Sequence, residues 1–217
     1  RRLTGPKTRN KIKSILLNFR KKYSKVYILI HGTFSSEDLK NEILSKIGND
    51  YDILMVHTSF DQLLPMYKGN VYELLKMLLQ ITEGKTLAMP AFTFGGSDPE
   101  ILKNFKKKPF FDRKKSPTQV GLINELFRRY PGVKRSLHPT TSVCAYGPLA
   151  DELTSSHHLS KYKMGPQTPF GIMNNKKTVI LGIGVYYFRN LTHVHTVEYT
   201  PGIDFPKKKK KTYETVN

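Results

Sequence analysis

The chain has 217 residues, of which 38% are hydrophobic and 11% are aromatic, so it can build a core in one large domain or two small ones. A single cysteine excludes a disulfide framework, and no run reaches the roughly 18 uncharged apolar residues that a membrane span requires. We therefore expect a globular, cytoplasmic protein without a membrane span.

The formal net charge of +19 is concentrated in three segments. Residues 1–25 carry ten Lys or Arg and no acid, residues 103–115 carry seven basic residues and one acid, and residues 207–211 are all lysine. These segments together account for +21, which leaves −2 for the rest of the chain, as in an ordinary enzyme. Two interpretations of the basic segments stay open: a docking surface for an anionic partner or membrane, and solvated charge with no partner.

No repeat or linker divides the sequence, so we expect a basic N-terminal arm over residues 1–25 and one domain over residues 26–217. Residues 26–30 form a short apolar run rich in β-formers and predict the first strand. Ser35 and Ser36, followed by two acids, predict the start of a helix that ends near Ile47.

Strand and helix signals then alternate. Asn70 and Glu73 have the spacing of an N-cap and its N3 partner, and they predict a helix that runs to about Gly84. We expect strands near residues 53–56, 86–89, 142–145 and 178–181, a helix near residues 122–129, and a helix-like stretch around residues 191–199. This alternation indicates an α/β fold with a mixed, mainly parallel central sheet and helices on both faces.

Several common catalytic and metal-binding signatures are incomplete. Gly182 and Gly184 follow a predicted strand but lack the third glycine of a dinucleotide fingerprint, and no Gly-x-Ser-x-Gly elbow is present. Cys144 lies inside an apolar run, which predicts a buried and unreactive thiol. His193 and His195 would point in different directions from a helix, so we expect no metal site.

Several blocks, taken in order, resemble the aminoglycoside 3-N-acetyltransferases. They cover residues 52–59 (DILMVHTS), 84–93 (GKTLAMPAFT), 109–112, 121–128, 135–139 (RSLHP), 168–170 and 195–198, and the similarity extends from about residue 35 to residue 217. This resemblance implies an acetyl-CoA-dependent N-acetyltransferase that acts on an amino group of an aminoglycoside or a related amino sugar. An antibiotic acceptor, which implies antibiotic resistance, and a biosynthetic amino sugar are both left open.

An acceptor amine is protonated at neutral pH and must lose a proton before it attacks a thioester, so the site requires a base such as histidine. His138 precedes Pro139, which favours an extended or loop conformation, and loops at strand ends are where α/β sites assemble. A structural histidine is the alternative interpretation. The resemblance implies that His138 is the general base, with Glu198 as its acidic partner and His195 on the same helical face as Glu198.

The resemblance also implies a place for the cosubstrate and the acceptor. We expect cofactor contacts from His57, Thr58, Ser59, Lys68, Gly69, Asn70, Ser142 and Val143. The lone Gly69 stands where the family has paired glycines, and this departure weakens the prediction of CoA binding. Asp98 and Asp112 are the candidate acceptor-binding acids, although Asp98, which precedes Pro99, is equally explained as a helix cap.

Family members continue beyond the segment that matches residues 207–216, so either the C-terminal part of the domain is incomplete or the acceptor differs. The rival hypothesis is a catalytically altered scaffold of the same fold, which binds nucleic acid or an anionic surface through the basic segments. The sequence leaves the oligomeric state open, with a homodimer as one option.

Overall fold

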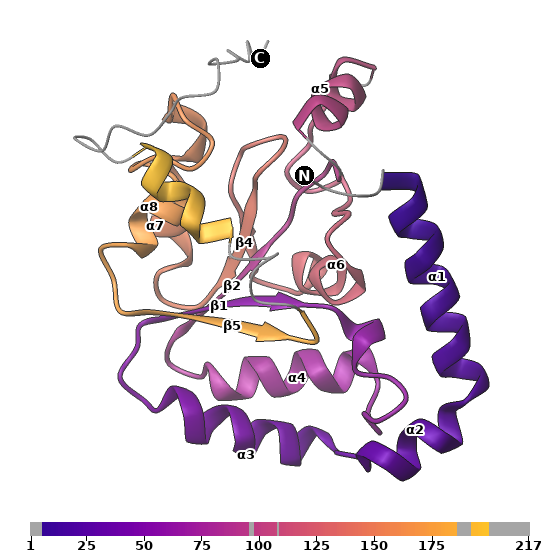
Figure 1. Ribbon diagram of the computed structural model, residues 1–217. Coiled ribbons are helices and arrows are strands. Elements are labelled where there is room, and N and C mark those ends of the chain that lie inside the picture. The colour runs from indigo at the N-terminus through magenta and orange to yellow at the C-terminus, as the bar shows by residue number, and fades with distance from the viewer. Residues whose placement is uncertain (1–5, 96–97, 108, 186–191, 200–217) are drawn as a thin grey trace.

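The computed structural model describes residues 6–95, 98–107, 109–185 and 192–199. Its N-terminal part consists of two helices, α1 (Pro6–Lys22) and α2 (Ser24–His31), which lie at the edge of the molecule (Figure 1). The strand predicted over residues 26–30 is therefore wrong. A short apolar run does not distinguish a strand from a helix by its periodicity, and no residue of α2 is buried as a sheet strand would be.

The five described strands form one sheet in the order β3-β4-β2-β1-β5. They are β1 (Ile53–Thr58), β2 (Thr86–Pro90), β3 (Lys134–Arg135), β4 (Val143–Tyr146) and β5 (Thr178–Ile183). β1 pairs in parallel with β2 and β5, whereas β4 is antiparallel to both β2 and β3, so β4 alone of these strands runs against the others. The predicted mixed, mainly parallel sheet is confirmed.

Helices cover both faces of this sheet (Figure 1). On one face, α4 (Val71–Ile81) and α6 (Leu122–Arg129) pack on the strands, and α3 (Ser36–Ile47) packs against α4. On the other face lie α7 (Ala150–Thr154) and α8 (Pro169–Met173). Side chains alternate along β1, with Leu54 and Val56 in the first core and Ile53 and Met55 in the second. Both faces of β1 are thus buried, which explains its continuous apolar sequence.

The start of α4 agrees with the predicted cap. The Asn70 side chain accepts hydrogen bonds from the N–H groups of Tyr72 and Glu73, and the Glu73 carboxylate accepts one from the N–H of Asn70. Ser35 and Asp38 form the same reciprocal box at the start of α3. The remaining described elements are η1 (Phe60–Gln62), α5 (Asp98–Lys107), η2 (His157–Leu159) and η3 (Thr192–Tyr199), of which η3 is a 3-10 helix where the sequence predicted a helix-like stretch.

The carboxyl ends of β1 and β5 meet at a tight turn. The N–H of Ser59 donates to the Ile183 carbonyl at 2.9 Å, and Gly184 follows with a φ of 65°. A Cβ placed on Gly184 would lie 2.6 Å from the Ser59 carbonyl oxygen, so this position requires glycine for both its backbone angle and its space.

Gly184→Ala is therefore expected to lower the free energy of unfolding by about 2–4 kcal/mol, as measured by urea denaturation. Gly84→Ala is the matched control because Gly84 has a φ of 72° and no atom within 4 Å of its Cβ position. The control should cost about 1 kcal/mol. Equal losses in the two variants would show that the contact with Ser59 is unimportant.

Candidate active site

The central strand β1 ends in three of the predicted ligand-binding residues, His57, Thr58 and Ser59. His57 lies beside Gly182, and Thr58 lies beside Ile183, in the parallel β1–β5 register. β1 is flanked by β2 on one side and β5 on the other, so the next strand in the chain and the last described strand lie on opposite sides of β1. Ligands of open α/β sheets bind outside the carboxyl ends of the strands at such a topological switch point. The structure thus places this predicted cluster where the fold favours a site.

Two imidazoles at this site, the buried His57 and the half-buried His193, each have a buried ring nitrogen without a partner among the described residues. His57 is 6% exposed, and its Nε2 has no hydrogen-bond partner within the described part of the chain. Burial and the nearby His193 lower the pKa of His57 to about 4. His193, on η3, likewise has an unpaired Nδ1, while its Nε2 contacts Asn174 Oδ1. Such unpaired buried nitrogens are costly without a ligand, which indicates a place for a polar group.

Asn124 links the ends of β1 and β2, a role that the sequence analysis missed. Its side-chain oxygen accepts a hydrogen bond from Thr58 Oγ1 at 3.2 Å, and its Nδ2 donates to the Pro90 carbonyl at 2.8 Å. Asn124 is 1% exposed on α6, between the buried Ile123 and Phe127. The sequence signal for this role was an amide side chain on the apolar face of a predicted helix, because a buried polar group requires hydrogen-bond partners.

Glu198 pairs with His195, not with His138 as predicted. His195 Nδ1 lies 2.8 Å from Glu198 Oε1, and the two side chains on η3 are 54% and 40% exposed. Because a carboxylate can only accept, Nδ1 carries the proton of this bond and Nε2 keeps its lone pair. This is the arrangement of an oriented histidine base.

His138 has the opposite hydrogen-bonding pattern. Its Nδ1 accepts from the N–H of Thr141 at 3.0 Å and lies 3.3 Å from the N–H of Thr140. Nδ1 is therefore unprotonated, and in the neutral ring the proton sits on Nε2. The ring stacks on His157 at 4.5 Å, and burial, His157 and Lys163 together lower the pKa of His138 to about 3. At neutral pH His138 is thus an uncharged N–H donor.

His157 beneath it is fully buried and fully hydrogen-bonded. Its Nδ1 lies 2.8 Å from Ser136 Oγ, and its Nε2 lies 3.2 Å from the Lys163 carbonyl. The pKa of His157 is lowered to about 4, mainly by burial. Ser136 also accepts a hydrogen bond from the N–H of Val143, so the two histidines are tied to the start of β4.

This burial predicts a pH-dependent stability. The folded-state pKa of His157 lies below the ordinary value of 6.5, so the unfolded state takes up a proton first and stability is lost as the pH falls from about 6.5 to about 4. One such histidine contributes up to about 1.4 kcal/mol per pH unit in this window. Denaturation of His157→Gln across this range should show a shallower slope than the wild type. Leu159→Ala, on the same 3-10 helix, should keep the wild-type slope, and an unchanged slope in His157→Gln would contradict the assignment.

The other predicted cofactor residues fall into two groups. Lys68 and Gly69 line a cavity of about 420 Å³ between the amino ends of α3 and α4, together with Glu73 and Lys76 of α4. The capping box at Asn70 already occupies N–H groups at this helix end and places the Glu73 carboxylate there. Two lysines on the cavity wall offset that charge. The cavity therefore offers fewer free anion-binding groups than the sequence implied.

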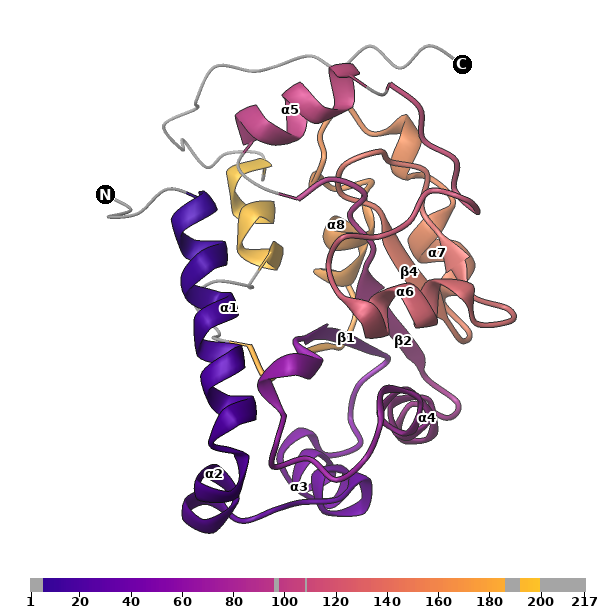
Figure 2. The ribbon, with the colours of Figure 1, turned by 90° about the vertical axis from the view of Figure 1, so that its right-hand side faces the viewer.

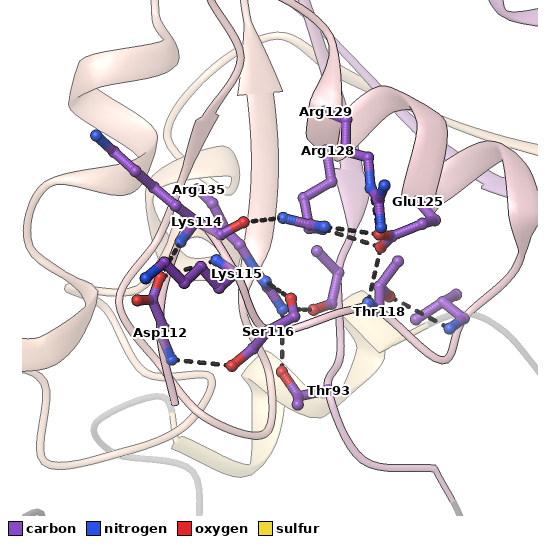
Figure 3. A network of polar contacts seen from close by, with 12 residues as sticks. Thr93, Asp112, Lys114, Lys115, Ser116, Thr118, Glu125, Arg128, Arg129 and Arg135 are labelled. Atoms are coloured by element: carbon purple, nitrogen blue, oxygen red, sulfur yellow. Dashed lines mark hydrogen bonds and ion pairs between the residues drawn. The ribbon is translucent and has the colours of Figure 1, made fainter. Parts of the chain in front are cut away.

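Ser142 and Val143 offer no side chain at the surface, because both are fully buried. Ser142 Oγ donates to the Ala91 carbonyl at 2.7 Å and accepts from Arg135 Nε at 3.0 Å. Arg135 also donates to the carbonyls of Ala91 and Ser116 at 2.5 Å and to Thr93 Oγ1 at 3.0 Å (Figure 3). The guanidinium is 4% exposed, lies over the ring of Phe111, and has no carboxylate within ion-pair distance among the described residues.

Neither predicted acceptor-binding acid is shown as a free carboxylate facing a site. Asp112 accepts from the N–H groups of Lys114 and Lys115 at 2.7 and 2.8 Å, which lowers the pKa of its carboxyl and closes a turn (Figure 3). Asp98 is the first residue of α5, and its side chain lies outside the described part of the structure. Asp112 therefore stabilises a turn.

The prediction of an unreactive cysteine is confirmed. Cys144 is fully buried on β4, and burial raises the pKa of its thiol to about 12, so no thiolate forms at neutral pH. No group of three or more His, Cys, Asp or Glu side chains in the described segments could hold a metal ion. The candidate proton-transfer groups of this site are therefore its histidines.

Known proteins are similar to this chain in sequence and in fold. The family described as aminoglycoside 3-N-acetyltransferase matches residues 55–217. The SPbeta prophage-derived aminoglycoside N(3')-acetyltransferase-like protein YokD of Bacillus subtilis (strain 168) is 30% identical over 67% of this chain and 58% of its own length. Aminoglycoside N(3)-acetyltransferase III of Salmonella sp is 30% identical over 80% of this chain and 63% of its own length, so the chain spans about three fifths of both relatives.

Among solved structures, AAC-VIa bound to sisomicin superimposes with a TM-score of 0.63 at 26% identity, covering 76% of this chain and 65% of that one. The apoenzyme of aminoglycoside acetyltransferase AAC(3)-IVa gives a TM-score of 0.61 at 28% identity, over 76% of this chain and 60% of that one. Sequence and fold agree with the resemblance stated above. The chain belongs to the aminoglycoside 3-N-acetyltransferase family.

Proposed function

We propose that this protein transfers an acetyl group from acetyl-CoA to an amino group of an aminoglycoside or a related amino sugar, by direct attack with a histidine base. The observation that carries this proposal is the oriented His195–Glu198 pair in a chain of this family. Cys144 is buried and protonated, so a covalent acetyl-cysteine is disfavoured. Direct transfer accordingly requires a base that accepts the amine proton.

His195 rather than His138 fits that role. The Glu198 carboxylate holds the Nδ1 proton of His195, leaves the Nε2 lone pair available to the amine, and stabilises the imidazolium that forms. In the step, a proton moves from the amine to His195 Nε2 as the nitrogen bonds to the acyl carbon, and the C–S bond then breaks. Acetyl-CoA supplies the thioester carbonyl carbon and the thiolate leaving group.

His138 suits a different role as an uncharged donor. Its pKa near 3 keeps the ring neutral, and the Thr141 N–H on its Nδ1 leaves the proton on Nε2. Such an N–H group stabilises negative charge that develops on a carbonyl oxygen without itself losing a proton. We thus assign proton acceptance to His195 and hydrogen-bond donation to His138.

The cavity at the start of α4 is the place that best fits the diphosphate and pantetheine of the cosubstrate. Lys68 and Lys76 supply positive charge. A Cβ on Gly69 would lie 2.5 Å from Tyr67 Oη, so glycine lets the backbone pass close to this tyrosine at the cavity. The unpaired Nε2 of His57 is a further polar group at the end of β1. Lys68 and Lys76 supply the attraction to the diphosphate, and salt screens that attraction, so we expect binding to weaken as salt rises.

The acceptor is proposed by class. The solved relative AAC-VIa holds sisomicin, an aminoglycoside. A resistance enzyme would accept such antibiotics, whereas a biosynthetic enzyme would prefer an isolated or nucleotide-linked amino sugar, which suits the basic segments of this chain.

The test has two parts. Calorimetric titration with acetyl-CoA measures cosubstrate binding, and release of free CoA in the presence of sisomicin or of amino sugars measures transfer. We expect micromolar binding and acceptor-dependent thiol release. Absence of both, together with salt-dependent binding to DNA, would favour the rival scaffold function over the enzyme.

A further inference from the structure

An apolar stripe on α1 faces the solvent. Ile12, Ile15, Leu16, Phe19 and Tyr23 follow the i, i+3, i+4, i+7, i+11 spacing that places side chains on one helical face. Each of these side chains is between 40% and 58% exposed. An amphipathic helix of a globular protein normally turns such a face to the core, so this orientation is the reverse of the usual one.

A neighbouring face of α1 contacts the body of the protein. Leu17 and Arg20 are half-buried, and Arg20 Nη1 donates to the carbonyl and to the Oε1 of Gln62, at 3.3 and 3.1 Å. These contacts fix the rotation of α1 and hold its apolar stripe outward.

The stripe continues on α2. Val26, Leu29 and Ile30 share one face of this helix and are 50%, 86% and 68% exposed. Tyr23, at the junction of the two helices, joins the two faces. α1 and α2 form the margin of the molecule away from α7 and α8 (Figure 2). We call the eight apolar side chains named above, five from Ile12 to Tyr23 and three on α2, the outer stripe.

The outer stripe lies in a segment that carries positive charge alone. Residues 6–31 contain eight Lys or Arg and no Asp or Glu, and the first acid of the chain is Glu37. Lys21, Lys22 and Lys25 are exposed beside the apolar side chains. The family model matches residues 55–217, so this segment lies outside the residues that the family model matches.

We propose that α1 and α2 dock on an anionic lipid bilayer, with the outer stripe in the headgroup region and the lysines against lipid phosphates. A helix with an exposed apolar face and a basic polar face has the chemistry of an interfacial membrane helix. It would lie on the surface, because none of the described helices is both long and apolar enough to cross a bilayer. The cytoplasmic leaflet, which carries anionic lipid, matches the location expected from the sequence.

Charge and surface type favour a bilayer over other occupants. Two copies packed through the outer stripe would bring two strongly basic segments together with no acid from residues 6–31 to offset them. A nucleic acid would satisfy the lysines but would leave the row of aliphatic and aromatic side chains exposed. A bilayer with anionic headgroups satisfies both.

The test is flotation of the protein with vesicles of phosphatidylcholine, alone or mixed with phosphatidylglycerol. We expect binding at least about tenfold tighter to the anionic vesicles, weakening as salt rises. The double variant Leu16→Gln/Phe19→Gln should lose about tenfold or more in affinity, whereas Asn18→Gln, on a polar face of α1, should bind like the wild type. Lys21→Gln/Lys22→Gln should reduce the preference for anionic lipid. Circular dichroism checks that each variant keeps its helices.

Several results would overturn the proposal. These are equal binding to both kinds of vesicle, binding that the double variant retains, a dimer in analytical ultracentrifugation that the double variant dissociates, and tighter binding to DNA than to vesicles. Flotation is independent of acetyl transfer, so its outcome does not depend on the proposed enzymatic activity.

Discussion

Replacing His195 with glutamine is expected to lower kcat for amine acetylation by about 10²- to 10⁴-fold, the usual contribution of a general base. Glutamine keeps a polar side chain of similar length but cannot accept the amine proton. Acetyl-CoA affinity should stay within about twofold of the wild type, because His195 is assigned to the proton transfer and not to the cosubstrate cavity. Thiol release measures kcat, and calorimetry measures binding.

Companion variants separate the roles of the histidines. Glu198→Gln should lower kcat less than His195→Gln, because the base remains but its orientation and charge partner are lost. His138→Gln keeps an N–H donor and should retain more activity than His195→Gln. The exposed His158, on η2, is the control and should be replaceable without loss. Loss of activity in His138→Gln with normal turnover in His195→Gln would reverse the assignment and restore His138 as the base.

A large effect on stability is also expected from Arg135. Arg135→Met should lower the free energy of unfolding by about 3 kcal/mol, since it leaves the Ser116 carbonyl without this donor and removes hydrogen bonds to three separate segments, at residues 91–93, 116 and 142. Arg135→Lys should still cost about 2 kcal/mol, because an ammonium cannot reproduce the planar fork. Urea denaturation measures both values.

Arg129→Met is the matched control for charge removal. Arg129 is 67% exposed and pairs with Glu125, and a surface pair of this kind contributes little stability, about 0–1 kcal/mol. If Arg135→Met were no more destabilising than Arg129→Met, the buried guanidinium would be dispensable for the fold. It would then be a candidate for a ligand contact instead.

Much of the fold was predictable because its signals are local. The capping pairs at Ser35 and Asn70 mark the starts of α3 and α4, and strand positions for β1, β2, β4 and β5 follow from short apolar runs. The segment at residues 26–30 has an equally apolar sequence and forms a helix. Its state therefore depends on tertiary context and not on its own sequence alone, and it takes no place in the sheet order β3-β4-β2-β1-β5.

The sequence supplied candidates for the site but not the hydrogen bonds between them. His57, His138, His195 and Glu198 were predicted as candidates, but the proposal of a base depends on which ring nitrogen donates and which accepts. That is set by the position of the Thr141 N–H and of the Glu198 carboxylate, which no spacing rule specifies. Asn124 and Arg135 were missed as linking residues, because their partners are 34 and 44 positions away in the chain.

The complete burial of β1 between two parallel neighbours bears on how the protein moves. A strand that is buried along its whole length, and that pairs with β5 as far as Thr58, belongs to the part of a protein that opens last, so the His57 end of the site should be pre-formed before any ligand arrives. Adjustment to a ligand must then come from the periphery, from the exposed cap of α4 and the short helix η3. On ligand binding, the carboxyl end of β1 would stay fixed, while the start of α4 and η3 would adjust to the ligand.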